Sequence, residues 1–530
     1  MGDKNSNLTS ADAHQLLRRT GFGARPDQVA EIVNRTRGAV VAELLNFKPT
    51  KFKPTGKSGY VAHNRWVKYM IVKSSKRGKA GTKKGLRGRQ IALQEKLVLF
   101  WHDHFATGLS KVYSVKLMGR QNLLLRQHCK GNFKEFVKAI NMDAAMLEYL
   151  DTVRNHRFSP NENYGRELQE LFTLGVKDFL GAANYDQEDI VQIARAFTGW
   201  GYDYRSLKVG FDEFDHNVIG DADDDGVNPQ PPETGDKVIY RNHGNFGSNG
   251  ISYVPVEGEG ATEIDNVIEV ILQHTDTDTP PRNTTARHIA KKLFQYFTHT
   301  NPETSVIDEV IGASSFDSAW DIQALLSALF VHDAFYETGE LAPFDSDTKK
   351  SVRWPIDYLV GTLACLNMRL RTGDQYVDGQ DGGTAYDYLG DMGQTLLDPP
   401  SVFGWDWEEA WISSFSTLAR CSFACDIVTA RGGTSKSKRY LQLGKVLDLA
   451  ALDDGSMSPN AVAIVDAVLA AMGIPGQLDT AQHKALRTYL TGLAYPMSDA
   501  AHVNLTPDFI DEKLRGLLLL VLESPAYHIH

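Results

Sequence analysis

The residues best suited to acid–base chemistry lie in one stretch, residues 161–175. It contains Glu162, Glu167 and Glu170, with Arg166 among them. On a helix, Glu167 and Glu170 share a face because they are three positions apart. Mutual repulsion and burial raise the pKa of one carboxyl and leave the other ionised, which suits a general acid and a base, or an acid and a nucleophile, acting on a glycosidic bond. A structural network of Glu–Arg pairs explains the same residues.

A second group is the run Trp101-His102-Asp103-His104-Phe105. Either histidine could assist acid–base catalysis, or both could bind zinc, iron or manganese with a carboxylate from the first stretch. Residues two apart on a continuous helix point in different directions, so a shared metal requires a helix end there. The alternative is that one histidine caps the helix and the other packs beneath the aromatic rings.

Amides and flat aromatic rings are the side chains that bind sugars, by hydrogen bonding and by stacking. The substrate-binding candidates of these two kinds are Asn155, Asn161, Trp101, Trp200 and Trp405. Core packing at the junctions between domains is the alternative for the tryptophans.

Residues 221–226 fit the Asp-x-Asp-x-Asp-Gly opening of a calcium loop, with Asp221, Asp223 and Asp225 as the ligands. The acid expected at loop position twelve is absent, since Pro232 occupies it. The pattern predicts a non-standard calcium site, and a solvated acidic loop is the alternative.

Composition excludes several classes. The formal net charge of −10 argues against a general nucleic-acid binder. No apolar run is long enough for a membrane span. The four cysteines are too few for a disulfide scaffold in a chain of 530 residues, and we expect them to be packed thiols. Residues 68–89 are strongly basic, which indicates a solvated loop or a landing site for an anionic polymer.

The elements that must position these residues are mostly helices. Apolar residues at helical spacing predict helices over 8–47, 90–107, 115–150, 161–175, 186–198, 263–274, 283–298, 318–332, 349–368, 409–430, 438–452, 458–472, 479–493 and 507–524. The fold class is mainly α, with long irregular insertions and at most a small β-hairpin region. Three parts are expected: an N-terminal helical lobe at 1–200 carrying the site, an Asp/Gly-rich insertion at 201–262, and a C-terminal helical lobe at 263–530.

Eight motifs along the chain are similar to those of the bacterial family catalogued as domain of unknown function 1800. They occupy residues 16–23, 101–105, 146–151, 161–175, 196–200, 286–293, 393–400 and 404–405. Asp103 departs from the family pattern, in which asparagine is expected. The resemblance implies an exported protein, periplasmic or extracellular, often encoded beside a sulfatase- or phosphatase-like partner. It implies no reaction.

We therefore expect a carboxylate-dependent hydrolase or lyase acting on an extracellular polymer, with a polysaccharide as the leading substrate class. Glu162, Glu167 and Glu170 are the acid–base candidates, assisted by Arg166, His102 and His104. The first alternative is a metal-dependent enzyme, such as an oxidoreductase, that uses His102, His104 and a carboxylate. The second is a non-catalytic exported binding or maturation protein. No nucleophile elbow, phosphate-binding loop or dinucleotide motif is present.

Overall fold

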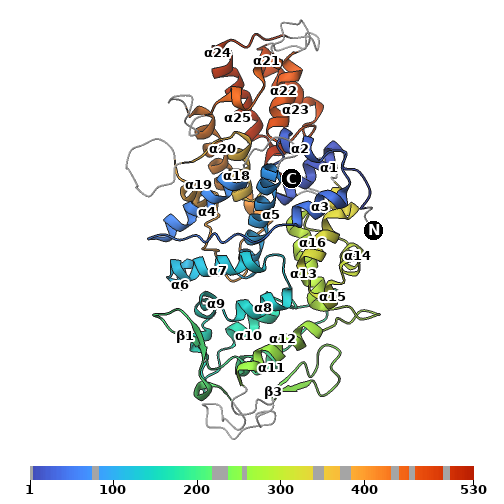
Figure 1. The fold of residues 1–530 in the computed structure, drawn as a ribbon, viewed down its shortest axis with the longest axis vertical. Coiled ribbons are helices and arrows are strands. Elements are labelled where there is room, and N and C mark those ends of the chain that lie inside the picture. Colours follow the sequence, from blue (N-terminus) through green and yellow to red (C-terminus); the bar gives the residue numbers. More distant parts are fainter. Residues whose placement is uncertain are drawn as a thin grey trace.

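Helices α5 (Lys83–His104) and α13 (Thr284–Phe297) run through the middle of an elongated, mainly α-helical molecule, as Figure 1 shows. The structure is a computed structural model, and it describes residues 4–74, 83–217, 237–253, 260–337, 351–370, 383–430, 441–452, 460–492 and 502–529. Two small two-stranded sheets are the β-structure within these residues, so the mainly α prediction is confirmed. No helix in the described part of the chain is long and apolar enough to cross a membrane.

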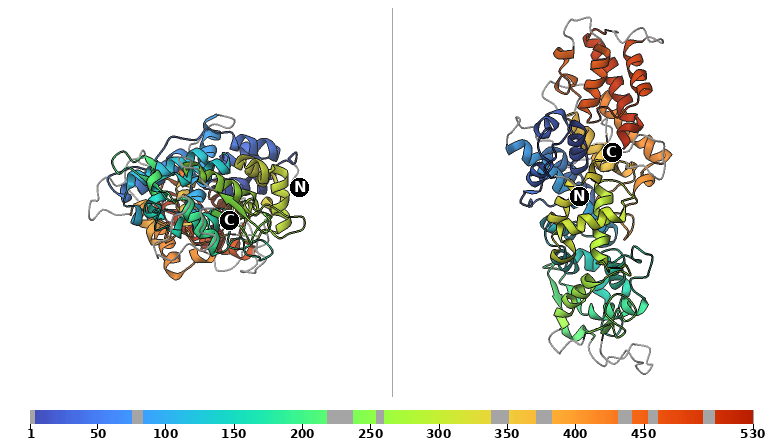
Figure 2. Two further views of the ribbon diagram at one scale, coloured as in Figure 1. Left: turned by 90° about the horizontal axis from the view of Figure 1, so that it is seen from below. Right: turned by 90° about the vertical axis from the view of Figure 1, so that its right-hand side faces the viewer.

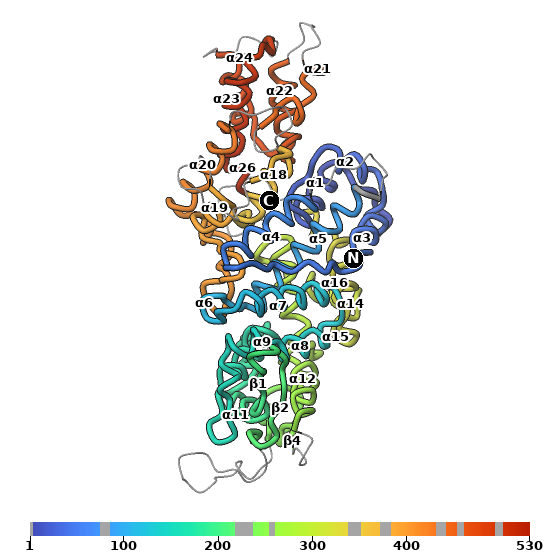
Figure 3. Tube along the Cα trace, turned by 60° about the vertical axis from the view of Figure 1, so that its left-hand side comes forward, coloured from blue at the N-terminus to red at the C-terminus, as the bar shows by residue number. Residues whose placement is uncertain are grey.

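The middle of the molecule combines the start of the chain with residues near 300 and 360 (Figures 1 and 3). Besides α5 and α13, its helices are α1 (Ser10–Thr20), α2 (Pro26–Ile32), α3 (Arg37–Leu45), α4 (Gly59–Ser74), α6 (Leu109–Val112), α7 (Val115–His128), α14 (Thr304–Ser314), α15 (Phe316–Ala319), α16 (Ile322–Val331), α17 (Asp333–Tyr336) and α18 (Pro355–Cys365).

One end of the molecule carries the predicted site and both sheets (Figures 1 and 3). Its elements are α8 (Phe133–Asn141), α9 (Ala144–Tyr149), η1 (Thr152–Arg154), α10 (Glu162–Glu170), α11 (Gln187–Ala196), η2 (Glu213–Asp215), η3 (Gly260–Thr262) and α12 (Glu263–Gln273). Strand β1 (Trp200–Tyr202) pairs antiparallel with β2 (Val209–Phe211), and β3 (Lys237–Ile239) pairs antiparallel with β4 (Ile251–Tyr253).

The opposite end is built from the last part of the chain, as the views in Figures 1 and 2 agree. Its elements are α20 (Ser414–Thr429), η5 (Leu443–Lys445), α21 (Leu449–Leu452), α22 (Asn460–Ala471), α23 (Thr480–Thr491), α24 (Pro507–Phe509), η6 (Ile510–Leu514) and α25 (Arg515–Glu523). Three further elements of this part of the chain lie against the middle of the molecule: α19 (Ala385–Asp391), η4 (Glu408–Trp411) and α26 (Pro525–His528). The last helix, α26, returns to the middle of the molecule, where Tyr527 is fully buried.

Two local predictions are wrong. Residues 68–89 are helical wherever they are described, because α4 extends to Ser74 and α5 begins at Lys83. The reason is that Trp66, Val67 and Met70 form a buried face while Lys68 is exposed, so the helix needs no break. Helix α14, at 304–314, was not expected. The small hairpin predicted near 237–240 is confirmed as β3 and β4.

The predicted division at residue 263 stays a prediction, but strong contacts cross it. Lys96 of α5 pairs with Asp357 of α18 at 2.6 Å, and both side chains are buried. Arg37 of α3 pairs with Asp333 at 2.5 Å. Of the cysteines, Cys129 and Cys365 are buried as expected, whereas Cys425 is exposed.

Candidate active site

Helix α10 carries the three predicted carboxylates, and all three are half-buried. Asn161 starts the helix, because its side-chain oxygen accepts a hydrogen bond from the backbone N–H of Asn163 at 3.0 Å. Tyr164 and Leu168 are buried and anchor the helix to the core. Their burial fixes which side of α10 faces inward, so Glu167 lies at the boundary between core and solvent.

Glu167 is the carboxyl whose proton affinity suits catalysis. Burial raises its pKa to about 7, and the neighbouring Glu170 raises it further while Arg166 opposes the shift. A carboxyl with this pKa keeps a substantial protonated fraction near neutral pH. It can therefore donate a proton under conditions in which an ordinary glutamate cannot.

Glu170 is held by a tyrosine. The hydroxyl of Tyr185 donates a hydrogen bond to Glu170 Oε2 at 3.0 Å. Burial and the nearby Glu170 raise the pKa of Tyr185 above its usual value, so this hydroxyl remains a donor. The bond fixes the position of the Glu170 carboxylate beside Glu167. Tyr185 was not predicted, because it lies outside the 161–175 stretch and only the tertiary structure brings it close.

Glu162 and Arg166 form an ion pair at 3.2 Å, and Gln187 of α11 bonds both of them. Both charged side chains are about 40% exposed, at 39% and 41%. An exposed pair of this kind contributes only about 0.2–1 kcal/mol to stability. The main effect of Arg166 is therefore on the pKa of the neighbouring Glu167, which its positive charge lowers, and its effect on stability is small.

A further group borders Glu167. Burial raises the pKa of Tyr149, and the charges of Asp398 and Glu167 raise it further. Lys111 lies over the Tyr149 ring at 5.5 Å and pairs with Asp151 at 2.7 Å. Lys111 and Asp398 come from segments far from α10 in sequence, so helical spacing could not have identified them.

His102 lies in the core rather than at this surface. It is 1% exposed, and its Nε2 accepts a hydrogen bond from the backbone N–H of Leu397 at 3.1 Å. Its ring packs edge-on against Trp405 at 5.4 Å. Burial lowers its pKa to about 4, so it is neutral at physiological pH. These contacts give His102 a structural role in holding the loop after Gln394.

His104 is also buried, at 2% exposure, and joins the two predicted stretches. Its Nε2 donates to the carbonyl of Phe172 at 3.2 Å, and the Phe105 and Phe172 rings lie 5.2 Å apart. The two stretches do meet, but they meet through aromatic core. His102 and His104 bond different partners and are not among the described residues that cluster closely enough for a metal.

The predicted substrate-binding residues divide by burial. Trp101 is fully buried and its indole N–H donates to the Cys129 carbonyl at 2.9 Å, and Trp405 is 3% exposed. The prediction that these two rings bind substrate at a surface needs correction, because no open face remains for stacking. Trp200, in β1, is half-buried against Phe211 at 5.0 Å.

The two asparagines have backbone partners. Asn155 is buried, its amide donates to the Ala194 carbonyl at 2.8 Å, and its oxygen accepts from the backbone N–H of Asn161 at 2.7 Å. Asn155 thus ties the start of α10 to α11. Asn161 is the helix cap described above, so both positions have clear structural tasks.

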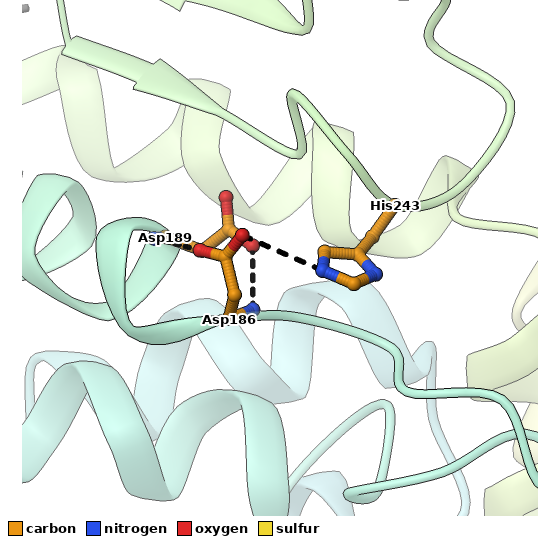
Figure 4. Close-up of side chains that lie close together, drawn as sticks. All are labelled: Asp186, Asp189 and His243. Carbon is orange, nitrogen blue, oxygen red and sulfur yellow. Dashed lines mark hydrogen bonds and ion pairs between the residues drawn. The ribbon is translucent and has the colours of Figure 1, made fainter.

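A metal-ligand type cluster occurs elsewhere in this part of the molecule, at Asp186, Asp189 and His243 (Figure 4). Both aspartates cap α11: Asp186 accepts from the backbone of Glu188 and Asp189, and Asp189 accepts from the backbone of Asp186 at 2.9 Å. His243 reaches Asp186 at 3.5 Å. These bonds explain the cluster as a tie between α11 and the loop after β3. Asp221, Asp223 and Asp225, the predicted calcium ligands, lie outside the described residues.

Comparison with curated proteins and with solved structures gave no match. A family model matches residues 15–529, nearly the whole chain. This match agrees with the resemblance carried by the eight sequence motifs. The chain therefore belongs to the family described as Protein of unknown function (DUF1800).

Proposed function

We propose that this protein is a carboxylate-dependent hydrolase or lyase that acts on an extracellular polymer, with a polysaccharide as its substrate class. The observation that carries the proposal is the pairing on α10 of Glu167, whose pKa is about 7, with Glu170, whose carboxylate is held by Tyr185. Two adjacent carboxyls in different environments are the usual basis for an acid and a base in one site.

In hydrolysis, protonated Glu167 would donate its proton to the oxygen of the leaving group. The Glu170 carboxylate would activate a water molecule or attack the sugar directly. Arg166 limits the rise in the pKa of Glu167, which keeps proton release possible at neutral pH. His102 and His104 would support the site only indirectly, by fixing the core beneath it.

The wider setting is part of the same proposal. We place the protein in the periplasm or outside the cell, where a sulfatase- or phosphatase-like partner would remove ester groups from the same polymer. Asp221, Asp223 and Asp225 would bind calcium within the predicted insertion at 201–262. Calcium titration of an Asp223→Asn variant would test that part separately, since the variant should lose any calcium-dependent rise in melting temperature.

The main test is cleavage of neutral, uronate-containing and sulfated polysaccharides by the purified full chain. New reducing ends would report hydrolysis, and ultraviolet absorbance of unsaturated ends would report a lyase reaction. Glu167→Gln should reduce the rate about 10²–10⁴-fold, the usual effect of losing a general acid or base. Unchanged circular dichroism and melting temperature would show that the fold is intact.

Glu188→Gln is a suitable control, because this glutamate lies on the neighbouring helix α11 and is not part of the site. It should retain full activity. Activity that survives in Glu167→Gln, or cleavage of none of the polymers, would contradict the proposal. A transition metal bound at one equivalent would instead favour the metal-dependent alternative.

A further inference from the structure

A basic surface lies where helices α6, α7 and α9 meet the hairpin of β1 and β2 (Figures 1 and 3). The chain as a whole has a net charge of −10, so a surface rich in cations is unusual for it. No acidic residue occurs between Asp103 and Glu135, the segment that contains α6 and α7. The side chains that form the basic surface are all exposed, and they are Lys111, Lys116, Arg120, Arg154, Arg205 and Lys208.

One contact joins the two halves of the basic surface. The Arg120 guanidinium of α7 donates a hydrogen bond to the Leu207 carbonyl at 2.8 Å, which holds the hairpin turn against the helix. Arg205 and Lys208 lie on either side of Leu207 in that turn. Lys116 is four positions before Arg120, so it lies on the same face of α7, one turn away.

The carboxylates beside the basic surface already have partners. Asp151, the cap of η1, pairs with Lys111 at 2.7 Å and with Arg154 at 3.4 Å. The other three accept hydrogen bonds: Glu148 from the Tyr202 hydroxyl at 2.9 Å, Asp203 from the Ser206 backbone N–H at 2.6 Å, and Asp398 from the Ser110 backbone N–H at 2.9 Å.

Three of the cations, in contrast, make no ion pair with any residue in the described part of the chain. They are Lys116 on α7 and Arg205 and Lys208 in the hairpin turn. Like charges gathered on one surface repel one another and create a local positive potential. This potential would attract a ligand that carries several negative charges.

The backbone of this surface adopts an uncommon conformation at three positions. Tyr113, Asp151 and Leu207 have φ angles of 54°, 58° and 57°, although none of them is a glycine. Residues with a side chain seldom adopt this left-handed conformation, and those that do are concentrated at active sites and ligand-binding sites.

Two tyrosine rings are open to solvent among the cations. Tyr113 lies between Lys111 and Lys116 in the chain and is 86% exposed. Tyr204 precedes Arg205 and is 71% exposed. A tyrosine offers a flat apolar ring and a polar hydroxyl, which suits the face and the hydroxyl groups of a sugar. Open rings beside unpaired cations therefore match a sugar that also carries negative charge.

The basic surface borders the α10 site. The side-chain amide of Asn163, in the first turn of α10, lies 3.5 Å from Asp151 Oδ2. Asp151 is also the partner of Lys111 and Arg154 in the basic surface. A polymer bound along the cations would thus reach the start of the helix that carries Glu167.

We propose that the basic surface binds a polysaccharide that carries anionic groups along its chain. Lys116, Arg205 and Lys208 contact the charged groups, and Tyr113 and Tyr204 contact the sugar rings. This inference rests on the proposed function and narrows its substrate class from polysaccharides in general to acidic ones.

The test is polysaccharide binding by the full chain carrying Glu167→Gln, so that a bound polymer is not cleaved, measured by affinity electrophoresis. Dextran and dextran sulfate share one backbone and differ in charge, and polygalacturonate carries carboxylates in place of sulfates. We expect an anionic polymer to bind at least about tenfold more tightly than dextran, and this preference should weaken as salt screens the exposed charges. Tighter binding of polygalacturonate would identify uronate groups, and tighter binding of dextran sulfate would identify sulfate esters.

Removal of two unpaired cations should weaken the binding of the anionic polymer. Lys116→Gln combined with Lys208→Gln should lower the affinity about tenfold, as expected for two exposed charge contacts. Lys4→Gln combined with Lys484→Gln is the matched control, because it removes two exposed lysines elsewhere in the molecule. This control should bind the polymer as tightly as the protein that keeps all four lysines.

Three results would overturn the inference: no preference for either anionic polymer over dextran, equal affinity in the two double variants, or equally tight binding of single-stranded DNA. The last result would show a general polyanion surface. Anionic polymers that bind but are not cleaved by the wild type would contradict only the proposed function. Cleavage of a neutral polymer without binding of the anionic ones would contradict only this inference.

Discussion

Burial sets the proton affinity of individual carboxyls in this protein. Asp103, Asp143, Glu167 and Glu408 each have a pKa of about 7, and in all four burial is the largest cause. Asp143 accepts a backbone hydrogen bond as the cap of α9. Glu167 differs from it because it lies beside a second carboxylate, Glu170, and an exposed arginine. The neighbours of the carboxyl, more than its pKa, distinguish a candidate acid from a structural one.

The protonation state of Glu167 predicts the pH dependence of any polymer cleavage. If protonated Glu167 is the general acid, the rate should fall as pH rises through about 7, because the carboxyl then loses its proton. Rates measured from pH 5 to 9 on a cleaved polymer would show this limb. A rate that increases through pH 7 would exclude Glu167 as the acid.

Asp103 predicts a pH-dependent change in stability. Its pKa in the folded chain, about 7, lies above the ordinary value of 3.8, so the folded chain holds a proton that the unfolded chain releases. Its contribution to stability therefore falls as pH rises from about 4 to 7 and stays low above that. Asp103→Asn should raise the free energy of unfolding by about 2 kcal/mol at pH 8.

Near pH 5 the substitution should bring no gain in stability. It should instead lower the free energy of unfolding by about 1 kcal/mol, because the hydrogen bond from the Trp407 indole N–H to Asp103 at 3.0 Å is lost. Denaturant unfolding at both pH values would measure the difference. Asp317→Asn, at an exposed position that is not among the charges acting on Asp103, is the control and should give a nearly equal effect at both pH values. If Asp103→Asn changed the free energy of unfolding equally at both pH values, the raised pKa of Asp103 would be contradicted.

At the scale of elements, short loops and caps fix both stretches that the sequence singled out, residues 101–105 and 161–175. The loop at 404–407 reaches Asp103 because Gly404 has φ 84°, and a Cβ at this position would lie 2.3 Å from Asp103 Oδ1. The Trp405 backbone N–H then donates to the same oxygen at 2.7 Å. The start of α10 depends in a similar way on Asn155 and Asn161.

The cap of α10 gives a prediction for this scale. Asn161→Ala should lower the free energy of unfolding by about 1 kcal/mol, because the bond to the Asn163 backbone N–H is lost at the helix start. The change would be measured by denaturant unfolding. Asn163→Ala keeps that backbone donor and should have a smaller effect. If Asn163→Ala were the more damaging substitution, the helix would not depend on this cap.

At the scale of the whole molecule, the last residues of the chain pack against the segment at 353–358 in the middle of the molecule. The Arg353 backbone N–H donates to the His528 carbonyl at 2.8 Å, and the Arg353 guanidinium lies over the Tyr527 ring at 4.5 Å. Tyr358 stacks on His528 at 5.1 Å. The last residues therefore support α18.

Removal of the Tyr527 side chain should destabilise the whole fold. Tyr527→Ala should lower the free energy of unfolding by about 3–5 kcal/mol, as for other large buried aromatic residues. Tyr527→Phe should cost only about 1 kcal/mol, since it removes just the hydroxyl that bonds Thr362. Thermal or denaturant unfolding would measure both. A mild effect of Tyr527→Ala would show that the packing of α26 is not needed for the stability of the middle of the molecule.

The sequence by itself determined the helical class, most helix positions and the carboxylate-bearing helix, because these depend on local spacing and capping residues. Helical periodicity located α10 and α11 to within a few residues. Helical periodicity could not distinguish a basic loop from an amphipathic helix at α4. The charges of this segment are visible in the sequence, but the burial of Trp66 depends on tertiary packing.

Only the tertiary structure decided which residues share a site. It buried His102 and His104, and it brought Tyr185 to Glu170. It also brought the hairpin turn at Leu207 against Arg120 of α7. The physical reason is that burial and long-range contact set proton affinity and charge balance, and neither is encoded by the spacing of neighbouring residues.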